Sequence, residues 1–226
     1  MKGRFLRAGL GAILVGLMVT ACAAKAQVRP ELLEGPGYTR TDNNLHQLEG
    51  PPAGRDAAPA FRLYRSGAPS RETFAKWCSE YQIRRVIVLS GTAEKYEHKY
   101  QADGICPEIQ VLYNEHQTVG EPVSDGFLQW FDQQVEAARR DQVGLLWRCQ
   151  TGSHRAGRLA AYHQMKAQGL SAEEAIAVMN HNGMLMPLFN LKLKPQVRAL
   201  SEHLQGQPCT QKKKSCVQVN SEAYLP

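Results

Sequence analysis

Residues 145–158 (LLWRCQTGSHRAGR) constrain the fold of this chain more than any other part of its sequence. The apolar run 143–147 has the length of a buried strand, and a helical pattern begins at Arg155. Only a short loop, which starts at Cys149 and contains Gly152, separates the two. A buried strand that passes through a tight loop directly into a helix is typical of an α/β sheet with parallel strands.

Strand and helix patterns alternate through the rest of the chain. Three further apolar runs have strand length, and they lie at 61–64, 86–89 and 109–113. Hydrophobic periodicity predicts helices at about 71–81, 124–140, 155–169, 171–179 and 195–204. Ser70 is a predicted N-cap, and Ser171 with Glu174 forms a capping box. We therefore predict an α/β fold with a central, mostly parallel sheet flanked by helices, and with the loop after Cys149 between a central strand and a helix.

The start of the chain has the pattern of a bacterial export signal. A basic stretch precedes the apolar run 8–21, which is shorter than the ~20 residues that a spanning helix needs. The run ends in Thr-Ala-Cys22, which resembles the lipobox of bacterial lipoproteins, in which the cysteine is acylated and becomes the mature N-terminus. We therefore predict a signal peptide at 1–21 and lipid attachment at Cys22. The alternative is cleavage a few residues later, which would give a soluble secreted protein.

Lipid attachment would place the protein in a bacterial cell envelope. Ala23 stands where an Asp often signals retention in the inner membrane, which favours the outer membrane, facing the periplasm. The predicted domain order is a lipid-anchored tether at 22–57, a globular domain at 58–205 and a basic tail at 206–226. A net charge of +6, part of it in the signal peptide, is too small to indicate a nucleic-acid partner. The sequence does not indicate an oligomeric state.

The cysteine count fits an exported protein. Of six cysteines, Cys22 is assigned to lipid and Cys149 to chemistry. The remaining four are even in number, as expected of two disulfides in an oxidising compartment, and they are Cys78, Cys106, Cys209 and Cys216. Four cysteines allow three pairings, and the short loops favour pairing the first with the second and the third with the fourth. Four unpaired thiols are the alternative.

The loop after Cys149 has the residues needed to bind a phosphate beside a nucleophile. Backbone N–H groups of residues 150–155 can converge on one anion at the start of a helix. Arg155 offers a bidentate fork to two phosphoryl oxygens, and the same positive surroundings favour the thiolate form of Cys149. We expect Cys149 and Arg155 to be catalytic. The predicted substrate-binding residues are Gln150, Thr151, Gly152, Ser153, His154, Arg155 and Arg158.

This segment resembles the signature loop of protein tyrosine and dual-specificity phosphatases. It is most similar to the atypical dual-specificity type that includes inositol pyrophosphate phosphatases, with Cys149, Gly152, His154, Arg155 and Gly157 in the pattern C-x-x-G-x-H-R-x-G. The segment 63–69 also resembles the Tyr-Arg-Ser opening of that domain, and the similarity covers about residues 60–190. The resemblance implies a phosphatase fold and hydrolysis of phosphomonoesters through a cysteinyl phosphate, without cofactor. We find no metal-ligand spacing among the histidines.

Two positions depart from the family pattern. Arg148 replaces the usual His before the nucleophile, and Ala156 replaces the usual Ser or Thr after the loop arginine. The missing hydroxyl predicts slower breakdown of the thiophosphate intermediate. These departures keep a second hypothesis open, a pseudophosphatase that binds phosphorylated ligands without turnover. A rhodanese-like sulfurtransferase is a third, and the segment 64–66 argues against it.

A general acid is expected just beyond the end of a preceding strand. Glu115 follows the predicted strand 109–113 and is the first candidate, and Glu121 is the second. Asp125 and His116 are further alternatives, the latter because its unperturbed pKa suits proton transfer.

The substrate is either an inositol phosphate or a phosphoprotein carrying phosphotyrosine, phosphoserine or phosphothreonine. His154, Arg158 and Arg148 would add positive charge around the phosphate and favour polyanionic substrates. The segment 181–183 is interpreted as the end of a helix rather than as part of the site.

Overall fold

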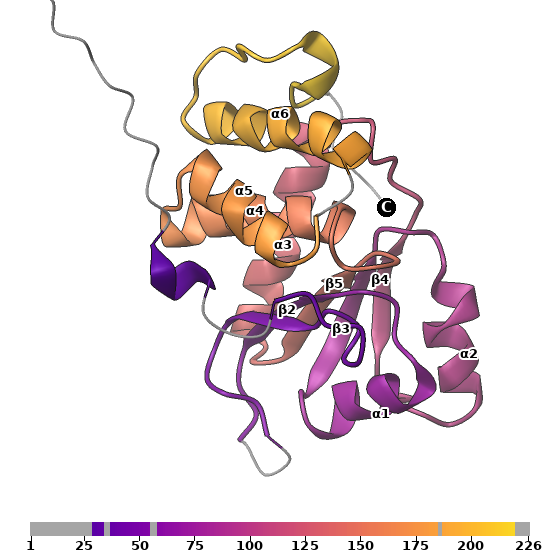
Figure 1. Cartoon of the computed structure of the whole chain (residues 1–226). Coiled ribbons are helices and arrows are strands. Elements are labelled where there is room, and N and C mark those ends of the chain that lie inside the picture. The colour runs from indigo at the N-terminus through magenta and orange to yellow at the C-terminus, as the bar shows by residue number, and fades with distance from the viewer. Residues whose placement is uncertain (1–28, 34–36, 55–57, 185–186, 220–226) are drawn as a thin grey trace, which may run out of the picture.

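The computed structural model describes residues 29–33, 37–54, 58–184 and 187–219. The predicted signal peptide and the predicted lipid site Cys22 lie outside these residues. A five-stranded sheet forms the centre of the molecule, in the order β1-β2-β5-β3-β4 (Figure 1). Its strands are β1 (His46–Glu49), β2 (Arg62–Ser66), β3 (Ile83–Val88), β4 (Gln110–Asn114) and β5 (Gly144–Arg148). Only β1 is antiparallel to its neighbour, which confirms the mostly parallel sheet.

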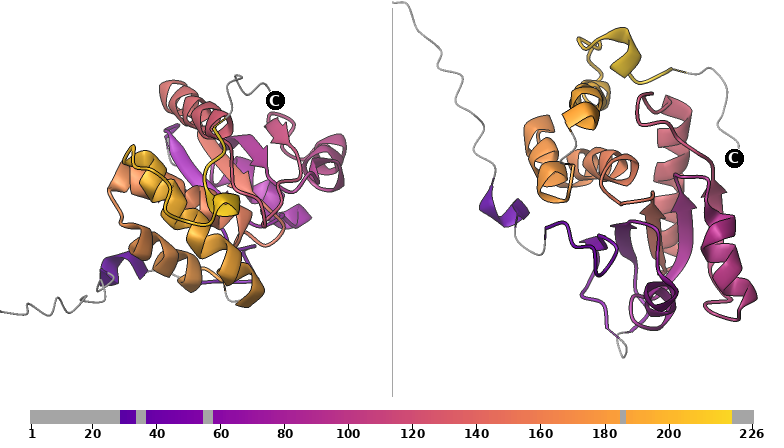
Figure 2. Two further views of the ribbon diagram at one scale, coloured as in Figure 1. Left: turned by 90° about the horizontal axis from the view of Figure 1, so that it is seen from above. Right: turned by 45° about the vertical axis from the view of Figure 1, so that its right-hand side comes forward.

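Helices cover both faces of this sheet. They are α1 (Arg71–Ser79), α2 (Glu97–Ala102), α3 (Asp125–Arg140), α4 (Arg155–Gln168), α5 (Ala172–His181) and α6 (Pro187–Leu204). Short 3-10 turns occur at Pro30–Leu33, Ala93–Lys95 and Lys213–Ser215. The larger hydrophobic core lies between one face of the sheet and the four helices α3, α4, α5 and α6. A smaller core lies between the other face and α1 with the segment around α2. Figure 2 shows α4, α5 and α6 gathered on the side of the sheet away from α1.

Strand β5 lies in the middle of the sheet and connects the two cores. Leu145 and Trp147 face the larger core, whereas Leu146 faces the smaller one, as the alternation of a strand requires. The Trp147 indole Nε1 donates a hydrogen bond to the carbonyl of Ala156, 2.9 Å away in the first turn of α4. This contact fixes the start of α4 against the strand, and with it the two ends of the loop that joins them.

Three elements differ from the sequence prediction. Strand β1 lies inside 22–57, the segment assigned to the tether, because it pairs with β2 although it offers only four residues and one aliphatic side chain, Leu48. Helix α2 was not predicted, since its six residues show no helical periodicity long enough to recognise. Helix α6 begins at Pro187 rather than at Pro195, and it continues through Pro195.

The predicted disulfides are confirmed. Cys78 pairs with Cys106 and links the end of α1 to the turn before β4. Cys209 pairs with Cys216 and fixes the chain after α6, where Gln218 exchanges backbone hydrogen bonds with Val123 and Asp125. Among the described helices, none combines the length and the apolar character needed to cross a bilayer.

Candidate active site

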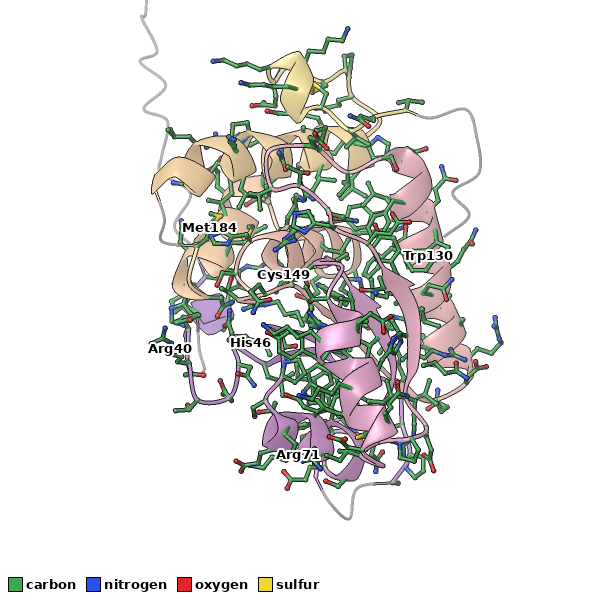
Figure 3. The ribbon with its side chains drawn as sticks, turned by 90° about the vertical axis from the view of Figure 1, so that its right-hand side faces the viewer. Arg40, His46, Arg71, Trp130, Cys149 and Met184 are labelled. Carbon is green, nitrogen blue, oxygen red and sulfur yellow. A yellow bond between two sulfur atoms is a disulfide. The ribbon has the colours of Figure 1, made fainter. Side chains whose placement is uncertain are left out.

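Cys149 lies at the carboxyl end of β5, at the base of the loop that leads into α4. Its side chain is buried, it is not part of a disulfide, and its backbone N–H donates to the carbonyl of Ser66 at 3.3 Å. Figure 3 shows Cys149 between the sheet and the helices above it. The sequence prediction of a strand, a short loop and a helix around Cys149 is confirmed.

Gly152 gives the loop its tight curvature. Its φ of +77° lies in the left-handed region, and a Cβ at this position would come within 2.8 Å of the backbone of Ser66 and Gly67. The loop is also tied to the strand end of β2 by a hydrogen bond from the Ala68 N–H to the Gln150 carbonyl, at 3.1 Å. Only glycine allows this close approach of two backbones.

The buried side chain of Asn44 supports the loop, a role that the sequence did not predict. Its Nδ2 lies 3.1 Å from the Thr151 carbonyl, 3.3 Å from the Ser153 hydroxyl and 3.1 Å from the Asn182 carbonyl. The His46 Nε2 lies 2.8 Å from the Asn44 Oδ1. Burial lowers the pKa of His46 to about 3, and positive charge from Arg65 adds to this, so a neutral imidazole donates to Asn44.

Replacing Asn44 with alanine tests this support. We expect Asn44→Ala to lower the free energy of unfolding by about 1–3 kcal/mol, because the buried groups that it contacts lose their partner. We also expect catalytic efficiency to fall more than it does for Gln47→Ala, a matched control whose amide contacts only the backbone of its own turn. Urea unfolding and steady-state kinetics measure the two effects. Equal kinetics in the two variants would exclude Asn44 from positioning the loop.

Arg155 begins α4 and points one nitrogen away from the loop. Its Nη1 donates to the Leu89 carbonyl at 3.0 Å and to the Gln117 carbonyl at 3.3 Å, and it lies 3.4 Å from the His116 Nδ1. Its Nε is buried and has no hydrogen-bond partner among the described residues. The guanidinium is therefore held on one side and keeps a donor for an anion, as expected of a phosphate clamp.

A second arginine, Arg65, lies fully buried under the loop. Its Nη1 donates to the Gly152 carbonyl at 2.8 Å. Burial lowers the pKa of Arg65 to about 10, and the charge of Cys149 acts in the opposite direction. Arg65 thus holds the loop by a backbone carbonyl and places a positive charge near Cys149. This gives a physical role to the Tyr-Arg-Ser segment that the sequence had only matched by resemblance.

Comparisons with known proteins identify this architecture. No protein-family model matches the chain, and no curated protein matches it either. The crystal structure of TpbA from P. aeruginosa is 21% identical, covers 66% of this chain and 88% of TpbA, and has a TM-score of 0.50. This chain has the fold of the protein tyrosine phosphatases. Tk-PTP also matches, with 18% identity over 66% of this chain and 98% of its own and a TM-score of 0.47.

In this phosphatase fold Arg158 has a different place from the predicted one. It was expected to bind substrate, but it is only 1% exposed and its Nη1 donates to the Glu121 carbonyl at 2.6 Å and to the Gln196 amide oxygen. Burial lowers its pKa to about 10, with Arg155 adding to the effect and Cys149 opposing it. Arg158 therefore borders the cavity that also holds Glu115 and Glu121, but its guanidinium is engaged by protein groups and almost fully buried.

Arg148 also lies elsewhere than predicted. Its guanidinium is fully buried and forms a two-pronged pair with Glu97, of which one contact is 2.6 Å. Its Nη1 donates to the hydroxyls of Ser90 and Thr92, at 2.8 and 2.9 Å. The expectation that Arg148 adds positive charge around the phosphate is wrong, because Glu97 neutralises it. Ala156, the other departure, is buried in the first turn of α4.

Three of the four acid candidates line one cavity of about 260 Å³. Glu115, His116 and Glu121 line it and are exposed, and the Tyr113 hydroxyl lies 3.4 Å from a Glu115 carboxylate oxygen. His116 is also the neighbour of Arg155. Asp125 is not among the lining residues and lies 2.9 Å from the His203 Nε2. Three of the four candidates thus lie on the active-site side of the fold.

The remaining residues of the loop after Cys149 differ in their exposure to solvent. Gln150 and Thr151 are exposed, and the Gln150 amide donates to the Tyr96 hydroxyl at 3.1 Å. Burial and the charge of Arg155 lower the pKa of His154, which favours its neutral form.

Helix α5 ends at His181, as predicted, and the Asn182 carbonyl after it contacts Asn44. The segment 181–183 therefore supports the loop indirectly, because it binds the Asn44 side chain that also binds the loop. Among the described residues there is no cluster of three metal-ligand side chains.

Proposed function

We propose that this protein is a phosphatase that hydrolyses phosphomonoesters through a cysteinyl phosphate on Cys149. The observation that carries this proposal is the buried free thiol at the base of an anion-binding loop, with the Arg155 Nε unpaired beside it. Two buried guanidiniums, Arg65 and Arg158, place positive charge near Cys149. The phosphatase fold agrees with this chemistry.

The reaction follows in two steps. The Cys149 thiolate attacks phosphorus and forms the P–S bond, while the P–O bond to the substrate breaks and a protonated acid gives its proton to the leaving oxygen. Water then attacks phosphorus, the same acid in its basic form takes a proton from it, and the P–S bond breaks. Arg155 and the loop N–H groups stabilise the charge on the equatorial oxygens in both steps.

Phosphate release from a panel of inositol phosphates, phosphopeptides and aryl phosphates tests this function. Turnover that depends on Cys149 supports it, and the panel separates the two substrate classes. Binding of phosphate esters without turnover would favour the pseudophosphatase hypothesis instead. Ala156 is the observation behind that alternative, because no hydroxyl stands at this position to assist breakdown of the intermediate.

Glu115 is our proposed general acid. We expect Glu115→Gln to slow the hydrolysis of alkyl phosphates about 10²-fold and that of nitrophenyl phosphate much less, since nitrophenolate leaves without a proton. Glu121→Gln is the matched control, because Glu121 lines the same cavity. Steady-state rates with both substrates measure the difference. A selective loss in His116→Gln, with Glu115→Gln unaffected, would transfer the role to His116.

We also propose that the protein is exported and anchored by lipid at Cys22, in a bacterial cell envelope facing the periplasm. The sequence 8–22 supports this, and the two disulfides agree with an oxidising compartment. The partners are then a phosphorylated small molecule or phosphoprotein and a membrane.

A further inference from the structure

A second cavity lies beside the loop after Cys149 and shares no lining residue with the cavity of the acid candidates. Its volume is about 250 Å³. The loop contributes Gln150 and Thr151 to its wall, and the turn after β2 contributes Gly67 and Ala68. The rest comes from the segment 38–44, which the sequence had assigned to the tether. A group bound here would be next to a phosphate held by the loop.

The chemistry of this cavity suits an anion. Arg40 lines it, is exposed, and makes no hydrogen bond or ion pair with any described residue. Figure 3 shows Arg40 at the periphery of the molecule. No acidic residue is among those that line the cavity. Tyr38, 45% exposed, adds an aromatic ring, and Thr151 and Gln150 add polar side chains at the loop edge. The carboxylate of Asp42, in the same segment, is hydrogen-bonded to Thr39 rather than paired with Arg40.

The segment that carries Arg40 is fixed to the active-site loop. The Tyr38 N–H donates to the His181 carbonyl at 3.2 Å, and the Gly67 N–H donates to the Asn43 carbonyl at 2.6 Å. Asn44, in the same segment, supports the loop through its side chain. Since the segment is held at both ends, the backbone at Arg40 has a defined position relative to the loop after Cys149.

We propose that this cavity is a subsite for a second anionic group of the substrate, a phosphoryl or carboxylate group, which Arg40 binds while Cys149 attacks the first. The proposal rests on the proposed phosphatase function and narrows its substrate class to molecules with two anionic groups. The prediction of a polyanionic substrate relied on Arg148 and Arg158. Both are buried, and their guanidiniums bind Glu97 and the Glu121 carbonyl, respectively. Arg40 supplies the exposed charge that they do not.

Arg40→Gln tests the subsite by substrate selectivity. The measurement is kcat/KM for a bisphosphate, such as an inositol bisphosphate, divided by kcat/KM for nitrophenyl phosphate. We expect Arg40→Gln to lower this ratio about 10-fold, through KM, because a charge-assisted contact to one substrate only is lost. Arg71→Gln is the control, since Arg71 is exposed on α1, pairs with Asp103 and does not line the cavity. An unchanged ratio in Arg40→Gln overturns the subsite.

Binding to Cys149→Ser protein separates this proposal from the proposed function. Calorimetry with the bisphosphate compares Cys149→Ser with the double variant that also carries Arg40→Gln. A dissociation constant raised about 10-fold by the second change supports the subsite, and equal constants overturn it. If the wild-type protein hydrolyses neither substrate, the phosphatase function fails, and the binding comparison still decides the role of Arg40.

Discussion

Cys149→Ser protein is expected to release no measurable phosphate from any substrate that the wild-type protein hydrolyses, a fall of at least ~10³-fold in kcat. The physical reason is that the reaction needs a thiolate as nucleophile, whereas a serine hydroxyl in the same place stays protonated and is a much weaker nucleophile. Measurement of inorganic phosphate over long incubations, with enzyme in excess, sets the limit of detection.

The same variant should keep its fold and its ability to bind. Oxygen is smaller than sulfur, and the Cys149 side chain contributes to a core that many larger side chains fill. Thermal unfolding checks the fold, and calorimetry with a phosphate ester checks binding. Turnover that survives in a folded Cys149→Ser protein would contradict the nucleophile assignment.

Glu97→Ala is expected to cost about 3–5 kcal/mol of unfolding free energy. Both Glu97 and Arg148 are 0% exposed, and the substitution leaves a buried guanidinium without its counter-charge. The loss should extend to activity, because Arg148 directly precedes Cys149 and also holds Ser90 and Thr92. Urea unfolding monitored by tryptophan fluorescence measures the stability change.

A surface ion pair provides the matched control for this prediction. Asp103→Ala removes the partner of Arg71, and both side chains of that pair are largely exposed, so we expect a change below about 1 kcal/mol. Replacing Arg148 with Met and Glu97 with Leu together should recover much of the stability, since a buried pair costs desolvation that an apolar pair does not. A loss of less than about 1 kcal/mol in Glu97→Ala would show that water reaches Arg148.

The sequence predicted those elements whose residues follow each other in one continuous segment of the chain. The strand, the loop after Cys149 and helix α4 follow each other directly, and the pairing Cys78–Cys106 encloses a short loop. What it missed depends on contacts between distant residues. Asn44 reaches Thr151 across 107 positions, and Glu97 meets Arg148 across 51. No local periodicity marks either residue.

Arg148 and Arg158 show why charge near a motif is a poor guide to substrate. In the sequence both stand beside the loop and look available to a phosphate. In the fold, β5 is a central strand and the first turns of α4 face the core, so side chains adjacent to the loop ends point into the protein. The accessible guanidinium comes instead from Arg40, more than a hundred positions earlier in the chain.

The two disulfides affect how the Cys149 thiol can recover from oxidation. They engage every other cysteine in the described part of the chain, so Cys149 has no second thiol there. Many oxidant-sensitive enzymes keep a resolving cysteine, which captures a sulfenic acid as a disulfide before oxidation proceeds to the irreversible sulfinic acid. A sulfenic acid formed on Cys149 would therefore need a thiol from outside the described fold to reduce it. The working lifetime of this protein is thereby coupled to the reductants of its surroundings.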